Sequence, residues 1–265
     1  MKLYKPYCFS TFGIGNEFKE YTKKVCIFID GLWFSSKEYQ ESEYRVFVGG
    51  CEPDISLRRY YSENDIIDNQ NKFDLILSSS KNIVNSCKNA KLFPFGSCWI
   101  DKNFKKLQNN FEVSFLCGFK NELIGHKLRH SIWDNLNKIK NIPIKKIFTT
   151  KLKKDYIFNT SQFSIIVENS KYENYFTEKI VDCLITKTIP LYFGCPNIKD
   201  YFDTRGFILF DSVEELIYKL SILTPEMYNN KLEYVEKNYN LALNYVDFHG
   251  RVDQYIIEGI KNECI

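Results

Sequence analysis

The chain of 265 residues lacks any hydrophobic run long enough to cross a membrane. A membrane-spanning helix needs about 20 consecutive, mostly apolar residues, and no stretch of this sequence approaches that length. Residues 1–24 also lack the uninterrupted apolar segment that a secretory signal peptide requires. We therefore expect a cytoplasmic protein that is neither secreted nor anchored in a membrane.

A strong excess of charge of one sign is missing too. Lys and Arg number 36 against 33 Asp and Glu, which gives a formal net charge of +3 and a pI near 8.2. Domains that bind nucleic acids are usually more basic, with a pI above about 9, so we expect no nucleic-acid partner. Lysines are frequent between Lys138 and Lys154. We interpret them as solvated surface, with an anionic membrane or a charged acceptor as the remaining explanation.

Recognisable metal-binding patterns are absent from the sequence. No two of the nine cysteines stand in a C-x-x-C spacing, and several lie in apolar runs, so we interpret them as reduced core residues. His126 and His130 are one helical turn apart, but only one other histidine, His249, exists in the sequence. We predict no metal site. Gly13 and Gly15 begin a glycine-rich pattern that is not completed, and no P-loop or G-x-S-x-G motif is present.

Short apolar runs alternate with helix-like segments through most of the chain, which is typical of parallel sheets flanked by helices. In the first half, the expected strands are residues 25–29, 44–48, 73–77 and 89–95. In the second half, the expected strands are residues 111–117, 146–149, 163–167, 189–193 and 207–210. Helices are expected at residues 126–139, at 175–186 and from 213 onward, the last with Asp211 and Ser212 as caps.

These patterns predict an α/β protein with two domains. We place the first domain at residues 1–110 and the second, with Rossmann-like strand order, at 111–265. The last 40 or so residues are expected to be mostly helical. Their expected apolar face consists of Leu232, Val235, Tyr239 and Leu243.

Polar residues gather directly after the expected strand 163–167. Glu168, Asn169 and Ser170 follow that strand, and Glu178 and Lys179 begin the next helix. In open parallel sheets, ligands bind at the carboxyl ends of strands, where helix N-termini offer backbone amides to phosphate groups. A lysine in the first turn of a helix is disfavoured by the macrodipole, and a bound pyrophosphate would offset its charge. A solvated helix start explains the same residues equally well.

The same segment resembles the α-1,3-fucosyltransferases, glycosyltransferase family ten. The resemblance rests on Phe163-Ser-Ile-Ile-Val-Glu-Asn-Ser170, on Asn174-Tyr-Phe-Thr-Glu-Lys179 and on Thr188-Ile-Pro-Leu-Tyr-Phe-Gly-Cys-Pro196, followed by Gly206-Phe-Ile208. The family pattern reads F-x-x-x-x-E-N-S, then Y-V-T-E-K, then a proline and glycine segment. The resemblance implies the GT-B fold, with two Rossmann-like domains facing a cleft and the donor bound by the second domain.

The resemblance also implies roles for individual residues. Arg129 matches an arginine that contacts donor phosphates, although it could instead be a surface residue of an amphipathic helix. Asn169 and Tyr175 would line the nucleotide, Lys179 would meet its phosphates, and Glu178 would hold the ribose or stabilise the positive sugar. Glu52 weakly matches the glutamate at the acceptor. It is our candidate general base, with an exposed loop glutamate as the alternative.

The resemblance therefore predicts an inverting glycosyltransferase that moves fucose from GDP-fucose to a hydroxyl of a glycan or glycoprotein. No Asp-x-Asp pair occurs in the sequence, so we expect no metal cofactor, with cationic side chains neutralising the diphosphate. Two alternatives stay open. The same fold could use another GDP- or UDP-sugar, or the chain could be a non-catalytic module that binds sugar nucleotides or glycans.

Overall fold

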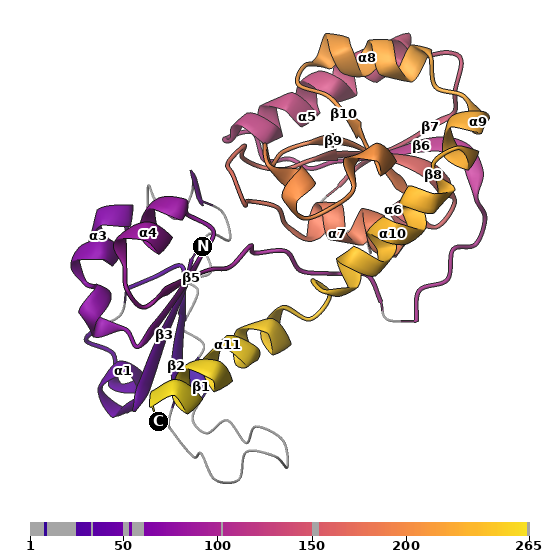
Figure 1. The fold of residues 1–265 in the computed structure, drawn as a ribbon. Coiled ribbons are helices and arrows are strands. Elements are labelled where there is room, and N and C mark those ends of the chain that lie inside the picture. Colours follow the sequence, from indigo (N-terminus) through magenta and orange to yellow (C-terminus); the bar gives the residue numbers. More distant parts are fainter. Residues whose placement is uncertain are drawn as a thin grey trace. The chain divides into compact units, whose positions relative to one another are not determined.

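The computed structural model describes residues 8–9, 25–32, 34–49, 53–54, 61–101, 103–149 and 154–263. Two compact units divide the chain (Figure 1): Met1–Phe95 together with His249–Ile265, and Gly96–Phe248. The sequence analysis placed the boundary after residue 110. In the structure, residues 96–110 belong to the second unit and the C-terminal helix belongs to the first.

The first unit contains a five-stranded sheet in the order β1-β2-β3-β4-β5, in which β1 is antiparallel to β2 and the other pairs are parallel. The strands are β1 (Cys8–Phe9), β2 (Val25–Ile29), β3 (Tyr44–Gly49), β4 (Leu75–Ser78) and β5 (Ala90–Leu92). Between them lie α1 (Lys37–Glu41), α3 (Glu63–Asp68), the 3₁₀ helix η1 (Gln70–Lys72) and α4 (Lys81–Ser86). Successive described strands are neighbours, so the sheet has no point at which its winding reverses.

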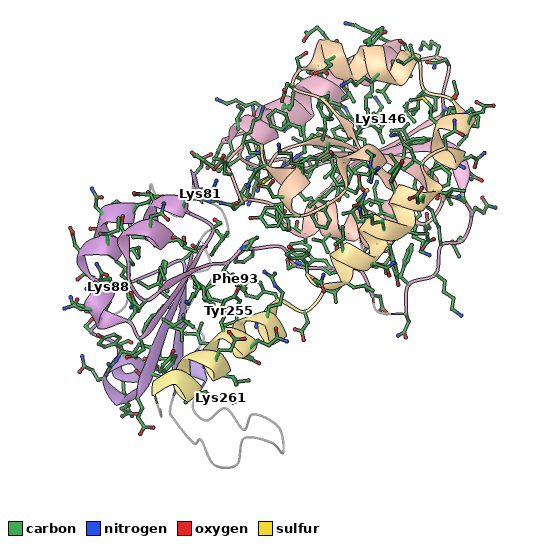
Figure 2. All side chains as sticks on the ribbon, in the orientation of Figure 1. Lys81, Lys88, Phe93, Lys146, Tyr255 and Lys261 are labelled. Atoms are coloured by element: carbon green, nitrogen blue, oxygen red, sulfur yellow. The ribbon has the colours of Figure 1, made fainter. Side chains whose placement is uncertain are left out.

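The C-terminal helix α11 (Phe248–Glu263) packs on this first unit. The rings of Phe93 and Tyr255, labelled in Figure 2, meet edge to face with centroids 5.7 Å apart. The Arg251 guanidinium donates to the carbonyl oxygen of Pro94 at 2.8 Å. A Cβ at Gly259 would lie 2.0 Å from the hydroxyl of Tyr44, so glycine permits this close approach of helix and sheet.

The second unit contains a fully parallel sheet in the order β10-β9-β8-β6-β7. Its strands are β6 (Asn110–Cys117), β7 (Ile144–Phe148), β8 (Ser161–Val167), β9 (Ile189–Phe193) and β10 (Ile208–Leu209). The chain adds β7 on one side of β6 and then returns to add β8 on the other side. The winding therefore reverses between β6 and β8, and such a switch point opens a crevice at the carboxyl ends of the two strands.

Helices cover both faces of this sheet. They are α5 (Ile124–Asn135), α6 (Asp155–Phe158), α7 (Glu178–Ile185), α8 (Val213–Ser221), α9 (Pro225–Asn229) and α10 (Leu232–Leu243), with the 3₁₀ helices η2 (Leu136–Lys138), η3 (Ile198–Asp200) and η4 (Thr204–Gly206). Figure 1 shows α5 and α8 on one face and α7 and α10 on the other. Along β8, Ile165 and Val167 pack in the α5–α8 core while Ile166 packs in the α7–α10 core. This alternation explains why the strand is apolar on both faces.

Two sequence expectations differ from the structure. Helix α7 begins at Glu178 instead of residue 175, because Thr177 has extended backbone and caps the helix by accepting from the Lys179 amide. In α10, Leu232 and Leu243 are 46% and 44% exposed. The buried residues of α10 are Val235, Asn238 and Ala242. Of the expected apolar face, Val235 is confirmed as buried and packs in the α5–α8 core, whereas the two leucines are exposed, and Asn238 and Ala242 complete the buried face. Of the two predicted caps of α8, Ser212 is confirmed, since its Oγ accepts from the Glu215 amide at 3.1 Å. Asp211 instead precedes the cap, and its amide donates to Glu215 Oε2 at 2.8 Å.

The structure describes the side chains of six cysteines, and none of these six forms a disulfide. Five are buried, namely Cys26, Cys87, Cys117, Cys183 and Cys195, and Cys98 is half-buried. For these residues, the interpretation as reduced core cysteines is confirmed. Among the described residues, no helix has both the length and the apolar character that crossing a membrane requires.

Candidate functional site

A cavity of about 290 Å³ lies at the switch point of the second unit's sheet. It is lined by residues at or just beyond the carboxyl ends of the strands: Gly118 after β6, Thr149 after β7, and Val167 and Asn169 at the end of β8. Helix α5 contributes His126 and Arg129 from its N-terminal half. The volume is near the lower end of the range found for ligand pockets. The sheet topology therefore creates a cavity beside the strand end where the sequence analysis expects the donor.

The lining of this cavity is strongly cationic. Lys120, Arg129, Lys154 and Lys179 all contribute to it. These charges affect the pKa of the buried His126. Burial lowers the pKa of His126, and Arg129, Lys120 and Lys179 lower it further, to about 4. The imidazole is therefore neutral near pH 7. Its Nδ1 accepts from the Leu123 amide at 3.3 Å, so its proton resides on Nε2.

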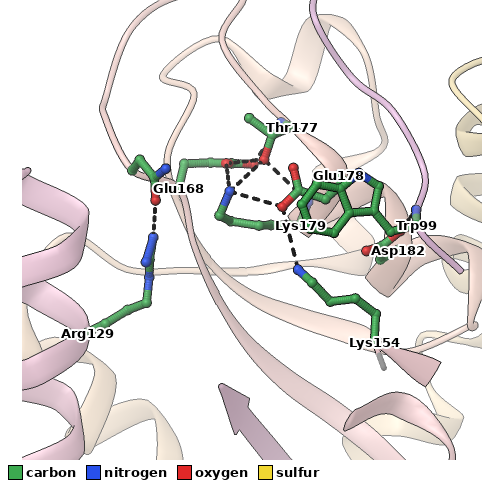
Figure 3. A network of polar contacts seen from close by, with 9 residues as sticks. Trp99, Arg129, Lys154, Glu168, Thr177, Glu178, Lys179 and Asp182 are labelled. Carbon is green, nitrogen blue, oxygen red and sulfur yellow. Dashed lines mark hydrogen bonds and ion pairs between the residues drawn. The ribbon is translucent and has the colours of Figure 1, made fainter. Parts of the chain in front are cut away.

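A fully buried carboxylate, Glu168, joins the end of β8 to the start of α7 (Figure 3). Its two oxygens accept from the Thr177 amide at 3.0 Å and from the Thr177 hydroxyl at 2.7 Å. The Lys179 ammonium lies 3.7 Å from Glu168 Oε2 and 3.3 Å from Glu178 Oε1. Burial raises the pKa of Glu168, whereas Lys179 and the Thr177 donors lower it in part. The charge of Lys179 at the helix N-terminus is thus offset by two glutamates of the protein itself.

Glu178 continues this network on the other side of Lys179. Its Oε1 also lies 3.5 Å from Lys154 Nζ. Burial raises the pKa of Glu178, but Lys179 and Lys154 lower it more, and the resulting pKa is about 2. Glu178 is therefore ionised at neutral pH and holds both lysines beside the cavity.

Arg129 is held differently. Its guanidinium donates to Oδ1 of Asn169, a neutral amide. Within the described part of the chain, no carboxylate oxygen lies within 4.0 Å of this guanidinium. An arginine oriented by an amide keeps its full charge for an incoming anion, and its planar fork suits the paired oxygens of a phosphate.

Gly125 permits this arrangement. Its amide donates to the Asn169 carbonyl at 3.0 Å, and a Cβ at this position would lie 1.7 Å from the carbonyl oxygen of Glu168. Since that obstacle is backbone, no side chain fits. The first turn of α5 can therefore contact the loop after β8, which brings Arg129, one turn later, to Asn169.

The structure brings four of the sequence-predicted residues together. Arg129, Asn169 and Lys179 line the cavity, and Glu178 contacts Lys179 directly. Tyr175 is fully buried and is not among the residues that line it. Glu52 lies outside the described residues.

Sequence reasoning missed several residues of this site. Lys154, which we interpreted as solvated surface, is only 18% exposed at its side chain and lines the cavity. Trp99 also lines the cavity, and no sequence pattern marked it as a site residue. Neither residue belongs to a motif, and both lie far in sequence from α7. Only the packing of α6 and of residues 97–101 against α7 places them there.

Metal ligation is not suggested by the described residues, among which no cluster of three or more His, Cys, Asp or Glu side chains is placed to hold an ion. His126 and His130 have separate partners, since Nε2 of His130 contacts the carbonyl oxygen of Lys120 at 3.1 Å.

Comparison with known proteins supplies the family. The profile of the C-terminal part of glycosyltransferase family 10 (fucosyltransferase) matches residues 102–251, more than half of the chain. The chain belongs to glycosyltransferase family 10. Every cationic side chain that lines the cavity lies inside the matched region. Of the residues labelled in Figure 3, all but Trp99 lie inside the matched region.

One curated relative is the α-(1,3)-fucosyltransferase FucT of Helicobacter pylori, which is 27% identical over 128 residues. The alignment covers 45% of this chain but only 26% of the relative, so the family 10 chain spans about a quarter of that enzyme.

Solved structures share the fold. A crystal structure of an α1,3-fucosyltransferase superposes with a TM-score of 0.51 and 16% identity, covering 84% of this chain and 80% of the other. S. aureus TarM, in a complex that contains UDP, superposes with a TM-score of 0.51 and 10% identity, covering 84% of this chain and 52% of TarM. The family 10 chain thus has the α/β GT-B fold with two largely parallel sheets, as expected from its sequence.

Proposed function

We propose that this family 10 protein is an inverting fucosyltransferase that uses GDP-fucose as donor and a glycan hydroxyl as acceptor. The observation that carries the proposal is the half-buried guanidinium of Arg129. It is oriented by a neutral amide and stands with Lys179 in one cavity at the switch point of the sheet. This is a prepared anion site of the kind that a diphosphate fits. The family profile and the name of the curated relative favour fucose as the sugar.

In the proposed reaction, the acceptor oxygen attacks the anomeric carbon of the sugar from the face opposite the diphosphate. A new carbon–oxygen bond forms, the bond from the anomeric carbon to the phosphate oxygen breaks, and GDP leaves with the electron pair. Negative charge grows on the departing diphosphate. Arg129 and Lys179 would stabilise that charge, and fixed cations in a site of low water content are effective at this task.

The remaining roles combine contacts in the cavity with the family resemblance. Asn169 orients Arg129, and Glu178 orients Lys179. The resemblance implies that Glu178 also holds the ribose or stabilises the positive sugar. His126 would add a neutral Nε2–H donor to the phosphate end. Glu52 would take the proton of the acceptor hydroxyl; this assignment rests on the sequence resemblance.

Binding and transfer assays on the full chain test the proposal. GDP and GDP-fucose should bind, and each should raise the melting temperature with the logarithm of its concentration above Kd. Incubation with GDP-fucose and a panel of glycans should yield a product heavier by one deoxyhexose in mass spectrometry. Binding of UDP but not of GDP would overturn the assignment of GDP-fucose as the donor. Donor binding without transfer to any acceptor or to water would instead favour a binding module.

A further inference from the structure

The end of the cavity away from Arg129 carries an exposed aromatic ring. Trp99 lines the cavity, yet its side chain is 64% exposed. Indole rings bury large apolar areas when they pack in a core, so core packing does not account for this placement. In Figure 3, Trp99 lies beside Glu178 and Lys154 at one end of the network, and Arg129 lies at the other.

The position of Trp99 is fixed from two sides. Its backbone amide donates to Oδ1 of Asp182, a fully buried residue of α7, at 2.7 Å. The Lys154 ammonium stands over its ring, 4.9 Å from the centroid. Lys154 is in turn held by Glu178 at 3.5 Å. The helix that supplies Lys179 to one end of the cavity thus also anchors the tryptophan at the other.

Besides the charged Lys154 and Glu178, the cavity that this ring lines has an apolar wall. Ile157 and Phe158, on the short helix that follows Lys154, line the same cavity. They belong to a core cluster against which Cys98, the neighbour of Trp99, also packs. A hydroxyl-rich sugar would leave polar groups without partners against such a wall. A planar base has an apolar face that suits it.

We propose that Trp99 is the stacking platform for the nucleobase of the donor, with Asp182 as the positioning residue that holds it there. This inference rests on the proposed function, because it takes the phosphates to lie at Arg129 and Lys179. From that end, the ribose would pass Glu178 and the base would reach the indole. Stacking of a base on an aromatic side chain tolerates any base, so Trp99 would contribute affinity instead of selecting guanine.

The test compares GDP with pyrophosphate, which has the diphosphate but no base. Wild type, Trp99→Ala and Trp99→Phe are titrated with GDP, pyrophosphate and GDP-fucose by calorimetry. Trp99→Ala should weaken GDP binding by about 5- to 100-fold and leave pyrophosphate binding unchanged. The GDP affinity of Trp99→Phe should lie between those of wild type and Trp99→Ala. Because the side chain is mostly exposed, melting temperatures without ligand should stay within a few degrees of wild type.

Fluorescence gives a second readout. The chain has three tryptophans, Trp33, Trp99 and Trp133. Saturating GDP should quench part of the emission of wild type and of the matched control Trp133→Phe, and that quenching should be lost in Trp99→Phe. Pyrophosphate should leave the tryptophan emission of wild type and of both variants nearly unchanged.

The outcomes separate this inference from the proposed function. Failure of wild type to bind GDP would overturn the proposed function and the inference with it. Wild-type GDP affinity in Trp99→Ala would overturn the inference alone, as would an equal loss of GDP and pyrophosphate. An effect on GDP-fucose without an effect on GDP would place the sugar on the ring and overturn the assignment to the base.

Discussion

The ammonium of Lys179 lies 3.7 Å from Oε2 of Glu168, a carboxylate with no solvent exposure. Glu168 also accepts both donors of Thr177, the residue that caps α7. One ion pair therefore stabilises the junction of β8 and α7 and also places a cation in the cavity. Lys179 has a structural and a proposed catalytic role at once, and any substitution of it tests both.

A pair of variants separates the two roles of Lys179. Lys179→Met leaves Glu168 buried without its cation, and removing one partner of such a pair should lower the free energy of unfolding by roughly 3 to 5 kcal/mol. Adding Glu168→Gln removes the uncompensated charge and should restore most of that loss. Donor binding should stay weak in the double variant. Calorimetric binding of GDP and urea unfolding measure the two effects, and recovery of GDP affinity along with stability would show that Lys179 does not meet the phosphates.

Arg129 offers a cleaner test, because among the described residues its guanidinium donates to a neutral partner, the side-chain amide of Asn169. Arg129→Ala should reduce kcat by about 10²- to 10³-fold as well as weakening donor binding, as expected when a group that meets developing charge is lost. Arg129→Lys should retain part of the activity, since it keeps the charge but not the planar fork. Exposed Lys127 on the same helix is the matched control, and Lys127→Ala should behave as wild type. An equal effect of the two alanine variants would argue against a specific phosphate contact.

Strands were the part of the structure most readily predicted from sequence. Residues 25–29 and 189–193 form β2 and β9 with the expected ends, because each is an apolar run bounded by polar or small residues. The start of α7 was placed three residues early. Tyr175 and Phe176 continue the apolar pattern but are buried in the preceding loop, where the Glu168 carboxylate holds Thr177 in the capping conformation. A side chain nine positions upstream decides this helix end, and local patterns do not contain that information.

The site was predictable where its residues lie in motifs and not elsewhere. Asn169, Glu178 and Lys179 follow one strand and begin the next helix, so their proximity follows from the order of elements alone. Lys154 and Trp99 reach the cavity only through contacts with Glu178 and Asp182. Similarly, an amphipathic pattern predicts that residues 248–263 are helical but does not specify which sheet they cover.

Metal dependence is a further test of how the diphosphate is neutralised. Four cationic side chains line the cavity, and the sequence contains no Asp-x-Asp pair to hold an ion against the donor. Transfer should therefore persist after dialysis against EDTA, with added Mg²⁺ changing the rate only modestly. The measurement is the initial rate of product formation before chelation, after it and after Mg²⁺ is returned. A complete loss that Mg²⁺ reverses would show that a metal bridges the phosphates.

The general base is assigned from the sequence resemblance, since Glu52 lies outside the described residues. Glu52→Gln removes a base without altering the charge at the donor phosphates, so GDP and GDP-fucose should bind with wild-type Kd while kcat for transfer falls by about 10²- to 10⁴-fold. Glu52→Asp should retain more activity than Glu52→Gln. Transfer at an unchanged rate in Glu52→Gln would move the role to another residue.

Asp182 makes stability depend on pH in a direction that is unusual for a carboxylate. Its side chain is fully buried, and burial raises its pKa to about 7, although Lys154 and the Trp99 amide oppose the shift. Between the unfolded pKa near 3.9 and the folded pKa near 7, the folded state binds a proton that the unfolded state has released. Stability contributed by this group is therefore complete below about pH 4 and is lost as pH rises through 7.

Asp182→Asn should remove that dependence. The amide oxygen can still accept from Trp99, and the side chain no longer ionises. The free energy of unfolding of the variant should therefore rise relative to that of wild type as pH rises from 4 to 8. Since one pKa unit corresponds to about 1.4 kcal/mol, the gain should be on the order of 2 to 4 kcal/mol at pH 8. Urea unfolding across this pH range measures it, and Asp134→Asn, at an exposed position of α5, is the matched control that should follow wild type. A variant that loses stability equally at pH 4 and pH 8 would show that Asp182 is ionised in the folded protein and acts there as a charged acceptor.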